Sequence, residues 1–161
     1  MSRRPDPVQP ADDAARTLTR DLLSLGHAAL AWTDPDTGTP GISRISFARD
    51  PEAGLLTLIS GLAPHFRALS SHPDCALMLG EVGEKGDPLT HPRLMIRAKA
   101  AFVAPDDPSR AGLRVRWLER NPKALVYIDL PDFAFVRLIP KSALLNGGFA
   151  RAFRLLPEDL M

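Results

Sequence analysis

A histidine and an arginine follow a proline where one predicted strand passes into a helix, in the stretch SGLAPHFRALSSHP. Pro64 suits the first helical position, because the amide of that position has no partner within the helix. The amides of the next residues would then be free, and the helix dipole would favour an anion beside them. His65 and Arg67 add donors that suit a phosphate, and Gly61 would let the backbone approach a ligand. The pattern is typical of a phosphate site, but an ordinary turn with solvated side chains is the simpler explanation of these residues alone.

A serine and an arginine lie in the middle of a second predicted strand, in the stretch GISRISFA. Alternation places Ser43 on the same face as Ile45 and Phe47, which are expected to be buried. The Ser43 hydroxyl is therefore expected to bond either to the backbone or to a ligand. Arg44 falls on the opposite face and is expected to point outward.

Two more stretches could either serve a ligand or simply shape the chain. Arg93 follows Pro92, and this pair marks either an ordinary strand start or a second basic anchor for a phosphate or a ring. In NGGFARAF, the glycines Gly147 and Gly148 beside Phe149 either form a turn or let the backbone lie flat against a planar ligand.

Composition and missing motifs exclude several classes of function. The 161 residues include 20 basic and 19 acidic side chains, and only 6% are aromatic, which gives no reason to expect a nucleic-acid partner. The four histidines form no close pair and there is one cysteine, so no zinc site is predicted. The chain has neither a G-x-S-x-G elbow nor a P-loop. No segment is apolar enough for a membrane span or a signal peptide, and a lone cysteine fits a reducing compartment, so we expect a soluble cytoplasmic protein.

Hydrophobic periodicity predicts more strands than helices, and the strands come in adjacent runs joined by short turns. This order predicts a mainly β fold, a small barrel with flanking helices. The proline-rich residues 1–10 are expected to be a flexible tail, and residues 11–161 a single domain. The predicted strands cover 27–33, 41–49, 55–60, 75–83, 93–104 and 132–140, and the predicted helices cover 11–26, a segment from Pro64, and 108–122.

Several of these stretches together, in this order, resemble the pyridoxamine 5′-phosphate oxidase-like FMN-binding split barrels. The similarity is greatest to the haem-utilisation branch, of the HugZ/HutZ type. The resemblance implies a split β-barrel and a homodimer with FMN held in clefts between the subunits. It also implies a flavin oxidoreductase whose substrate is unknown, or alternatively a non-catalytic protein that stores flavin or haem. The matching stretches are GISRISFA, LISGLAPHFRALSSHP, GDPLTHPRLMIRAKA, RWLERNP, YIDLPDFAFVRL and NGGFARA.

The resemblance also implies a role for individual positions. The strand that meets the phosphate and ribityl chain corresponds to Ser43, Arg44 and Ile45, and the strand end beside the flavin ring corresponds to Ser60, Gly61 and Leu62. His65 corresponds to a basic phosphate ligand with Arg67 close to it, Arg93 to a side chain that reaches the flavin, and Gly147, Gly148 and Phe149 to the segment that closes the site.

Two departures from the family's pattern limit the function. Haem-degrading members carry a C-terminal histidine that ligates the iron, whereas no histidine follows His91 in this chain. Weak haem binding, without ascorbate-driven haem breakdown, is therefore expected. The oxidase members have an Arg-Lys pair at the phosphate cradle and a C-terminal tryptophan, whereas this chain has Pro64-His65 and no tryptophan after Trp117. Oxidation of pyridoxamine phosphate is therefore not expected.

Overall fold

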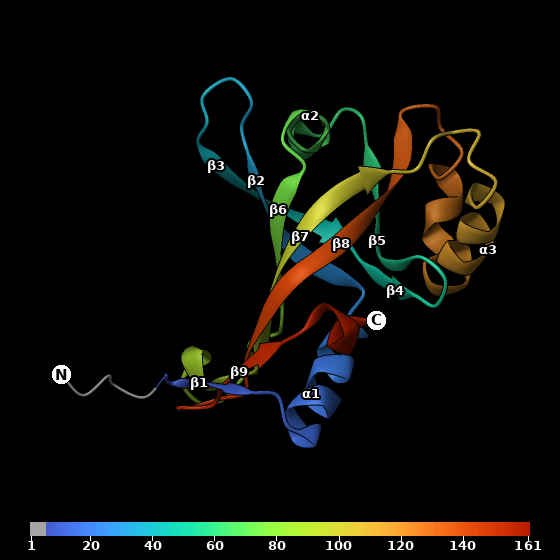
Figure 1. Cartoon of the computed structure of the whole chain (residues 1–161). Helices are drawn as coiled ribbons and strands as arrows, with labels where there is room; N and C mark the ends of the chain where they lie inside the picture. The colour runs from blue at the N-terminus through green and yellow to red at the C-terminus, as the bar shows by residue number, and fades with distance from the viewer. Residues whose placement is uncertain (1–5) are drawn as a thin grey trace.

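The computed structural model describes residues 6–161, and the first five residues lie outside the described part of the chain. Figure 1 shows strands crossing the centre of the molecule, with helices at its top, right and lower ends. The helices are α1 (Asp13–Leu23), α2 (Pro64–Ser71) and α3 (Arg110–Arg120), with short 3-10 turns η1 (Pro88–Thr90), η2 (Pro122–Val126) and η3 (Pro157–Leu160). The strands are β1 (Val8–Pro10), β2 (His27–Thr33), β3 (Pro40–Ser46), β4 (Ala48–Asp50), β5 (Gly54–Ser60), β6 (Asp74–Leu79), β7 (Arg93–Phe102), β8 (Phe133–Asn146) and β9 (Ala152–Leu155).

The strands form a barrel with a two-stranded extension. The sheet runs in the order β1-β9-β8-β7-β6-β2-β3, and β4 continues β3 after one residue. Because β4 pairs with β5 and β5 pairs with β8, the sheet closes on itself. The far half of β8 stays paired with β7, but on its other side it pairs with β9 in place of β5. The predicted fold class, a mainly β split barrel with flanking helices, is confirmed.

The long strand β8 turns from one part of the sheet to the other at a bulge. The pairing of β7 with β8 shifts between Arg97 and Ala98, so that Lys141 is the extra residue between Pro140 and Ser142. Proline has no amide hydrogen and is tolerated in a sheet at such irregular positions. The last long strand, predicted to end at Pro140, therefore continues to Asn146.

Two apolar clusters hold the helices to the barrel. The first fills the barrel and includes Leu22 and Leu23 of α1 and Leu69 of α2, so these helices cover its openings. The second packs α3, through Leu113 and Trp117, against the outside of β4, β5 and β8. Strand β5 faces both clusters, which explains why its side chains from 55 to 59 are all buried.

The flexible tail predicted for residues 1–10 is wrong for its last part. Val8–Pro10 form β1, which pairs in parallel with β9 at the edge of the sheet. Prolines are compatible with an edge strand, whose outer side needs no ladder hydrogen bonds. The part of the prediction that covers residues 1–5 lies outside the described residues. No helix within residues 6–161 has the length and hydropathy that a bilayer crossing requires.

Candidate functional site

His65 lies in the first turn of α2 and faces the interior of the barrel mouth. Its Nδ1 atom is 3.0 Å from the Oγ atom of Ser43, and Trp32 donates to the same oxygen from 3.0 Å. Gly41 makes this possible, because a Cβ there would stand 2.4 Å from the Trp32 ring. The backbone contact expected as one alternative for the Ser43 hydroxyl is replaced by these two side-chain contacts, and its contact with a ligand stays a prediction.

Burial lowers the pKa of His65, so the neutral imidazole is favoured at pH 7. Only 9% of the residue is exposed. When Ser43 donates to Nδ1, the ring proton lies on Nε2, and Nε2 is then the nitrogen left for a ligand. His65 can therefore offer a neutral hydrogen bond to an anion, which is weaker than the charged one that the sequence suggested.

Arg67 lies one turn from the start of α2 and is paired with the hairpin between β2 and β3. Its two terminal nitrogens each lie 2.7 Å from a carboxylate oxygen of Asp36. Both side chains are more than 60% exposed, so solvent screens this pair. Asp36 would have to be displaced before Arg67 could bind a phosphate with both nitrogens.

The strand end of β5 is held by the loop that precedes β8. Ser60 donates to the Asp132 carboxylate at 2.9 Å and accepts from the amide of Leu62 at 3.1 Å. The Gly61 amide donates to the Asp132 carbonyl at 2.6 Å. Leu62 itself is 90% exposed, so an apolar side chain projects from this turn.

Arg93 and the glycine segment lie together at the other end of β7 and β8. Arg93 pairs with Asn146 across the strands, and its guanidinium donates to the Leu89 carbonyl at 2.9 Å. Gly148 has a φ of +122°, which favours glycine, and its amide donates to the Asn146 side chain. Phe149 projects from this turn and is 87% exposed.

The twelve predicted positions therefore fall into separate places in one chain. β8 begins opposite Ser60 and ends opposite Arg93, so about 43 Å of extended strand separates these two pairings. The side chain of Ile45 is buried in the barrel core and meets no surface. A single cleft that holds both ends of β8 would need a second copy of the chain, and cofactor binding at these residues stays a prediction.

The outside of the barrel is apolar where no described helix covers it. In Figure 1, β7 and β8 cross the front of the barrel and no helix lies over them. Strand pairing aligns Arg44, Ala29, Met78 and Met95 in one row across β3, β2, β6 and β7. Arg44 is exposed, as the sequence predicted, and Met78 is 51% exposed. The neighbouring row holds, in the same strand order, Ile42, Ala31, Ala76 and Arg97.

Two arginines stand on either side of this strip of small side chains, which we call the alanine strip (Ala29, Ala31 and Ala76). Arg44 and Arg97 are three strands apart, about 14 Å at ordinary strand spacing. Within residues 6–161, neither guanidinium has a carboxylate oxygen within 4.0 Å. A hollow of about 430 Å³ opens beside Arg97, Ala31 and Ala76. The strip can therefore accept a flat apolar group with an anion at either side.

Several residues that shape these places were not singled out from the sequence. Trp32, Asp36 and Asp132 each form a hydrogen bond with a predicted site residue. Arg97 lies across the alanine strip from Arg44. Their partners are 11 to 72 positions away along the chain, so spacing gives no signal for them. Asp132 lies in the stretch YIDLPDFAFVRL, where the resemblance was the one available signal.

A closed barrel whose long strand β8 extends beyond its pairing with β5 to pair with β9 is a split barrel, and comparison with known proteins gives the family. No protein-family profile matches the chain. It is 32% identical over 116 residues to the chloroplastic haem oxygenase HOZ of Arabidopsis thaliana, covering 72% of this chain and 34% of HOZ. It is 29% identical over 126 residues to the haem oxygenase HutZ of Vibrio cholerae, covering 77% of this chain and 71% of HutZ. The chain thus spans about a third of the length of HOZ.

Comparison with solved structures also finds a HutZ protein. HutZ of Vibrio cholerae, described as a haem storage protein, superposes with a TM-score of 0.72 at 25% identity over 84% of this chain and 95% of that one. Two proteins share the fold alone. A FAD-binding protein of Mesorhizobium loti has a TM-score of 0.62 at 11% identity over 83% of this chain and 92% of its own. A Clostridium acetobutylicum protein of the pyridoxinephosphate oxidase family has a TM-score of 0.69 at 13% identity, and the match covers 94% of this chain and 100% of that one. The chain belongs to the pyridoxamine 5′-phosphate oxidase-like split-barrel family, in its HutZ-type branch.

Proposed function

We propose that this protein binds haem on the outer face of its barrel, between two copies of the chain. The observation that carries this proposal is the alanine strip with Arg44 and Arg97 on either side. Haem is flat and apolar and carries two propionates on one edge of the macrocycle, so the strip would contact the macrocycle and the arginine at that edge would pair with the propionates. The named relatives HOZ and HutZ are haem oxygenases, which supports haem over other planar anions.

The proposed haem face carries a histidine, His27, although no histidine follows His91 in this sequence. His27 lies on the same face as the alanine strip, and its Nε2 atom is 3.1 Å from a carboxylate oxygen of Glu81. A second copy over this face would exclude water from the ring and strengthen the arginine pairs. Haem, when bound, supplies an iron centre for redox chemistry. We place this function in the cytoplasm, because a chain with one cysteine fits a reducing compartment.

Removing the two arginines should weaken haem binding without affecting an uncharged analogue. The variant, Arg44→Gln or Arg97→Gln, that removes the arginine at the propionate edge should raise the haem dissociation constant about tenfold, since it removes a charge-assisted hydrogen bond. Titration of purified protein with haem, followed by its absorption band, measures this change. Haem dimethyl ester lacks the propionate charges, and its affinity should stay within about twofold of that of the wild type.

Arg20→Gln is the matched control, because Arg20 is an exposed arginine on α1. It should bind haem as the wild type does. Wild-type protein that binds no haem, or equal haem affinities in all four proteins, would contradict the proposal. Adding ascorbate to the haem-loaded protein tests the separate sequence-based expectation that haem is not broken down.

FMN is the second candidate ligand, as the cofactor of an oxidoreductase whose substrate is unknown. The observation that favours it is the Ser43–His65 pair at the start of α2, close in sequence to the exposed turn at Gly61 and Leu62. FMN would place its phosphate at His65 and its ring beside the β5 strand end. The flavin would supply hydride or electron transfer when bound.

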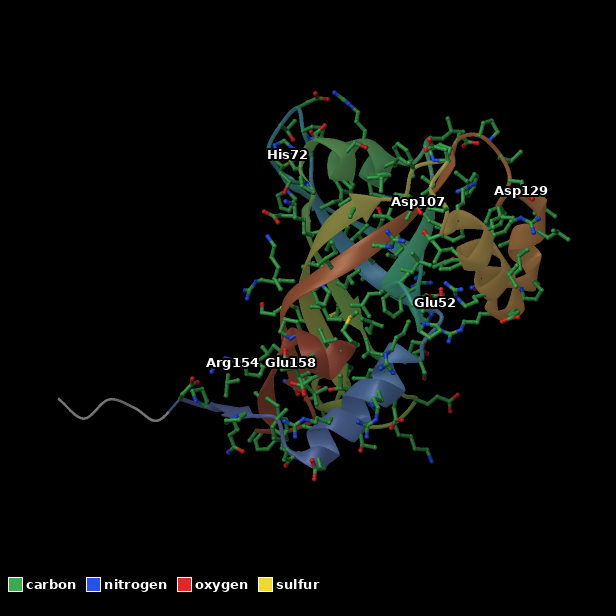
Figure 2. All side chains as sticks on the ribbon, turned by 45° about the vertical axis from the view of Figure 1, so that its right-hand side comes forward. Glu52, His72, Asp107, Asp129, Arg154 and Glu158 are labelled. Atoms are coloured by element: carbon green, nitrogen blue, oxygen red, sulfur yellow. The ribbon has the colours of Figure 1, made fainter. Side chains whose placement is uncertain are left out.

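A comparison of FMN with riboflavin tests this second candidate. His65→Ala should raise the FMN dissociation constant by up to about tenfold, because a neutral hydrogen bond is lost. Riboflavin has no phosphate, so its affinity should not change. His72→Ala is the control, since His72 is an exposed residue at the other end of the same helix, as Figure 2 shows. FMN affinity that is equal in wild type and His65→Ala would remove His65 from the site.

A further inference from the structure

A cavity beside α3 lies away from the alanine strip. It has a volume of about 720 Å³ and is formed by the end of β7, the start of α3 and the connection from η2 to β8. Cavities of roughly 300–1,000 Å³ are the usual size of small-molecule sites. Figure 2 shows Asp129, one of its border residues, on the connection beside α3.

Aromatic side chains form the walls of this cavity. Phe66 of α2 and Phe102 of β7 meet edge to face, with ring centroids 4.9 Å apart. Phe133 lines the cavity from β8, and its ring is stacked on Tyr127 at 4.8 Å. Rings held by other rings have little freedom to collapse into the space, so the cavity keeps a shape suited to a flat aromatic group.

The charged residues at the border differ in how far they are already paired. Asp129 is bound by Arg114 through two short hydrogen bonds of 2.7 and 2.6 Å. The Asp132 carboxylate accepts the Ser60 hydroxyl. The Arg110 guanidinium has no carboxylate oxygen within 4.0 Å among residues 6–161, and the hydrogen bond that it makes there is a long contact of 3.5 Å to the Ile128 carbonyl.

Arg110 is therefore the basic side chain at this cavity, and among residues 6–161 no carboxylate oxygen lies within 4.0 Å of it. Its guanidinium carbon lies 5.7 Å from the centroid of the Phe135 ring, which holds the group over an apolar surface. A guanidinium in this setting binds a carboxylate with two parallel hydrogen bonds. We propose that the cavity is a binding site for a small planar aromatic carboxylate, with the ring between the phenylalanines and the carboxylate on Arg110.

The site lies away from the alanine strip, where haem is proposed to bind. Gly61 is the one predicted cofactor residue that lines the cavity, and Arg44, Arg97 and His65 do not. Because the FMN candidate places its ring beside Gly61, a ligand here would bind in addition to haem but would compete with FMN, and its binding is measured on purified protein without added cofactor.

Calorimetric titration of the purified protein with 2-naphthoate tests the proposal. We expect a dissociation constant on the order of 0.1–1 mM, as for a ligand of this size. Arg110→Gln should raise it about tenfold, whereas the uncharged isostere 2-naphthamide should bind wild type and Arg110→Gln equally. Arg20 is an exposed arginine on another helix, so Arg20→Gln should leave naphthoate binding unchanged.

A second variant blocks the cavity itself. Ala104 is an exposed residue at its border, so Ala104→Trp should fold normally and reduce the affinity for both naphthoate and naphthamide. Thermal unfolding of each variant shows whether it is folded. Failure of naphthoate to bind the wild type, or equal binding to wild type and Ala104→Trp, would overturn the proposal. Equal naphthoate affinity in wild type and Arg110→Gln would overturn the role of Arg110.

Discussion

Asp50→Asn is expected to lower the free energy of unfolding by about 3 kcal/mol at neutral pH, the lower end of the loss seen when one member of a buried ion pair is removed. Asp50 ends β4 and is 6% exposed, and Arg116 of α3 reaches it through hydrogen bonds of 2.7 and 3.1 Å. The amides of Glu52 and Ala53 donate to the same carboxylate. Asparagine keeps an acceptor for these amides but removes the charge, which leaves Arg116 without its buried partner.

Thermal unfolding measures this loss, which for a chain of this size corresponds to a fall in Tm of about 6–12 °C. Glu52→Gln is the control, because Glu52 also contacts Arg116 but its side chain is 73% exposed, and Figure 2 shows it at the surface. It should change stability by less than about 1 kcal/mol. Equal losses from both substitutions would show that burial of the charge is not the cause.

The same residue gives stability a dependence on acid pH. Burial raises the pKa of Asp50, but the hydrogen bonds from Arg116 and from the two amides outweigh it, so the pKa falls below its ordinary value of 3.8. A lowered pKa in the folded state stabilises the protein above the unfolded pKa, and this stability is lost as the pH falls through the folded pKa. The difference in stability between wild type and Asp50→Asn should therefore be constant above about pH 5 and shrink below it.

Met78→Glu should convert a dimer into a monomer. The row of Met78, Met95 and Ala29 is an apolar face that the described part of the chain leaves uncovered, and such faces mark interfaces. A twofold dimer uses the same face twice, so each substitution would bury two carboxylates. The cost of burying charges without partners should raise the dimer dissociation constant at least about a hundredfold.

Sedimentation velocity at micromolar concentration measures the assembly. Val115→Glu is the matched control, since Val115 is similarly exposed, at 55%, but lies on α3 away from this face. It should remain a dimer. A wild-type chain that sediments as a monomer, or a Met78→Glu variant that still dimerises, would remove the support for a ligand site shared between two copies.

Much of the architecture could be predicted from local patterns. Alternation of apolar and polar residues predicted β3, and short apolar runs bounded by turns predicted β2 and β5, each within a few residues of its ends. The Pro64 start of α2 was also predictable, because proline fixes the backbone angle of a first helical position. The ends of α1 were less well predicted, since the helix stops at Leu23 rather than at Gly26.

The sequence by itself determined the residue types at each strand and turn, and hence the class of fold. It did not determine which side chains would meet, because hydrogen bonds such as Ser43–His65 or Ser60–Asp132 join segments 22 and 72 positions apart. Only the tertiary structure showed that His65 is buried, and burial decides the charge state of its ring. Only the strand register aligned Arg44 and Arg97 on either side of the alanine strip, because a shift of one residue would turn each side chain to the other face.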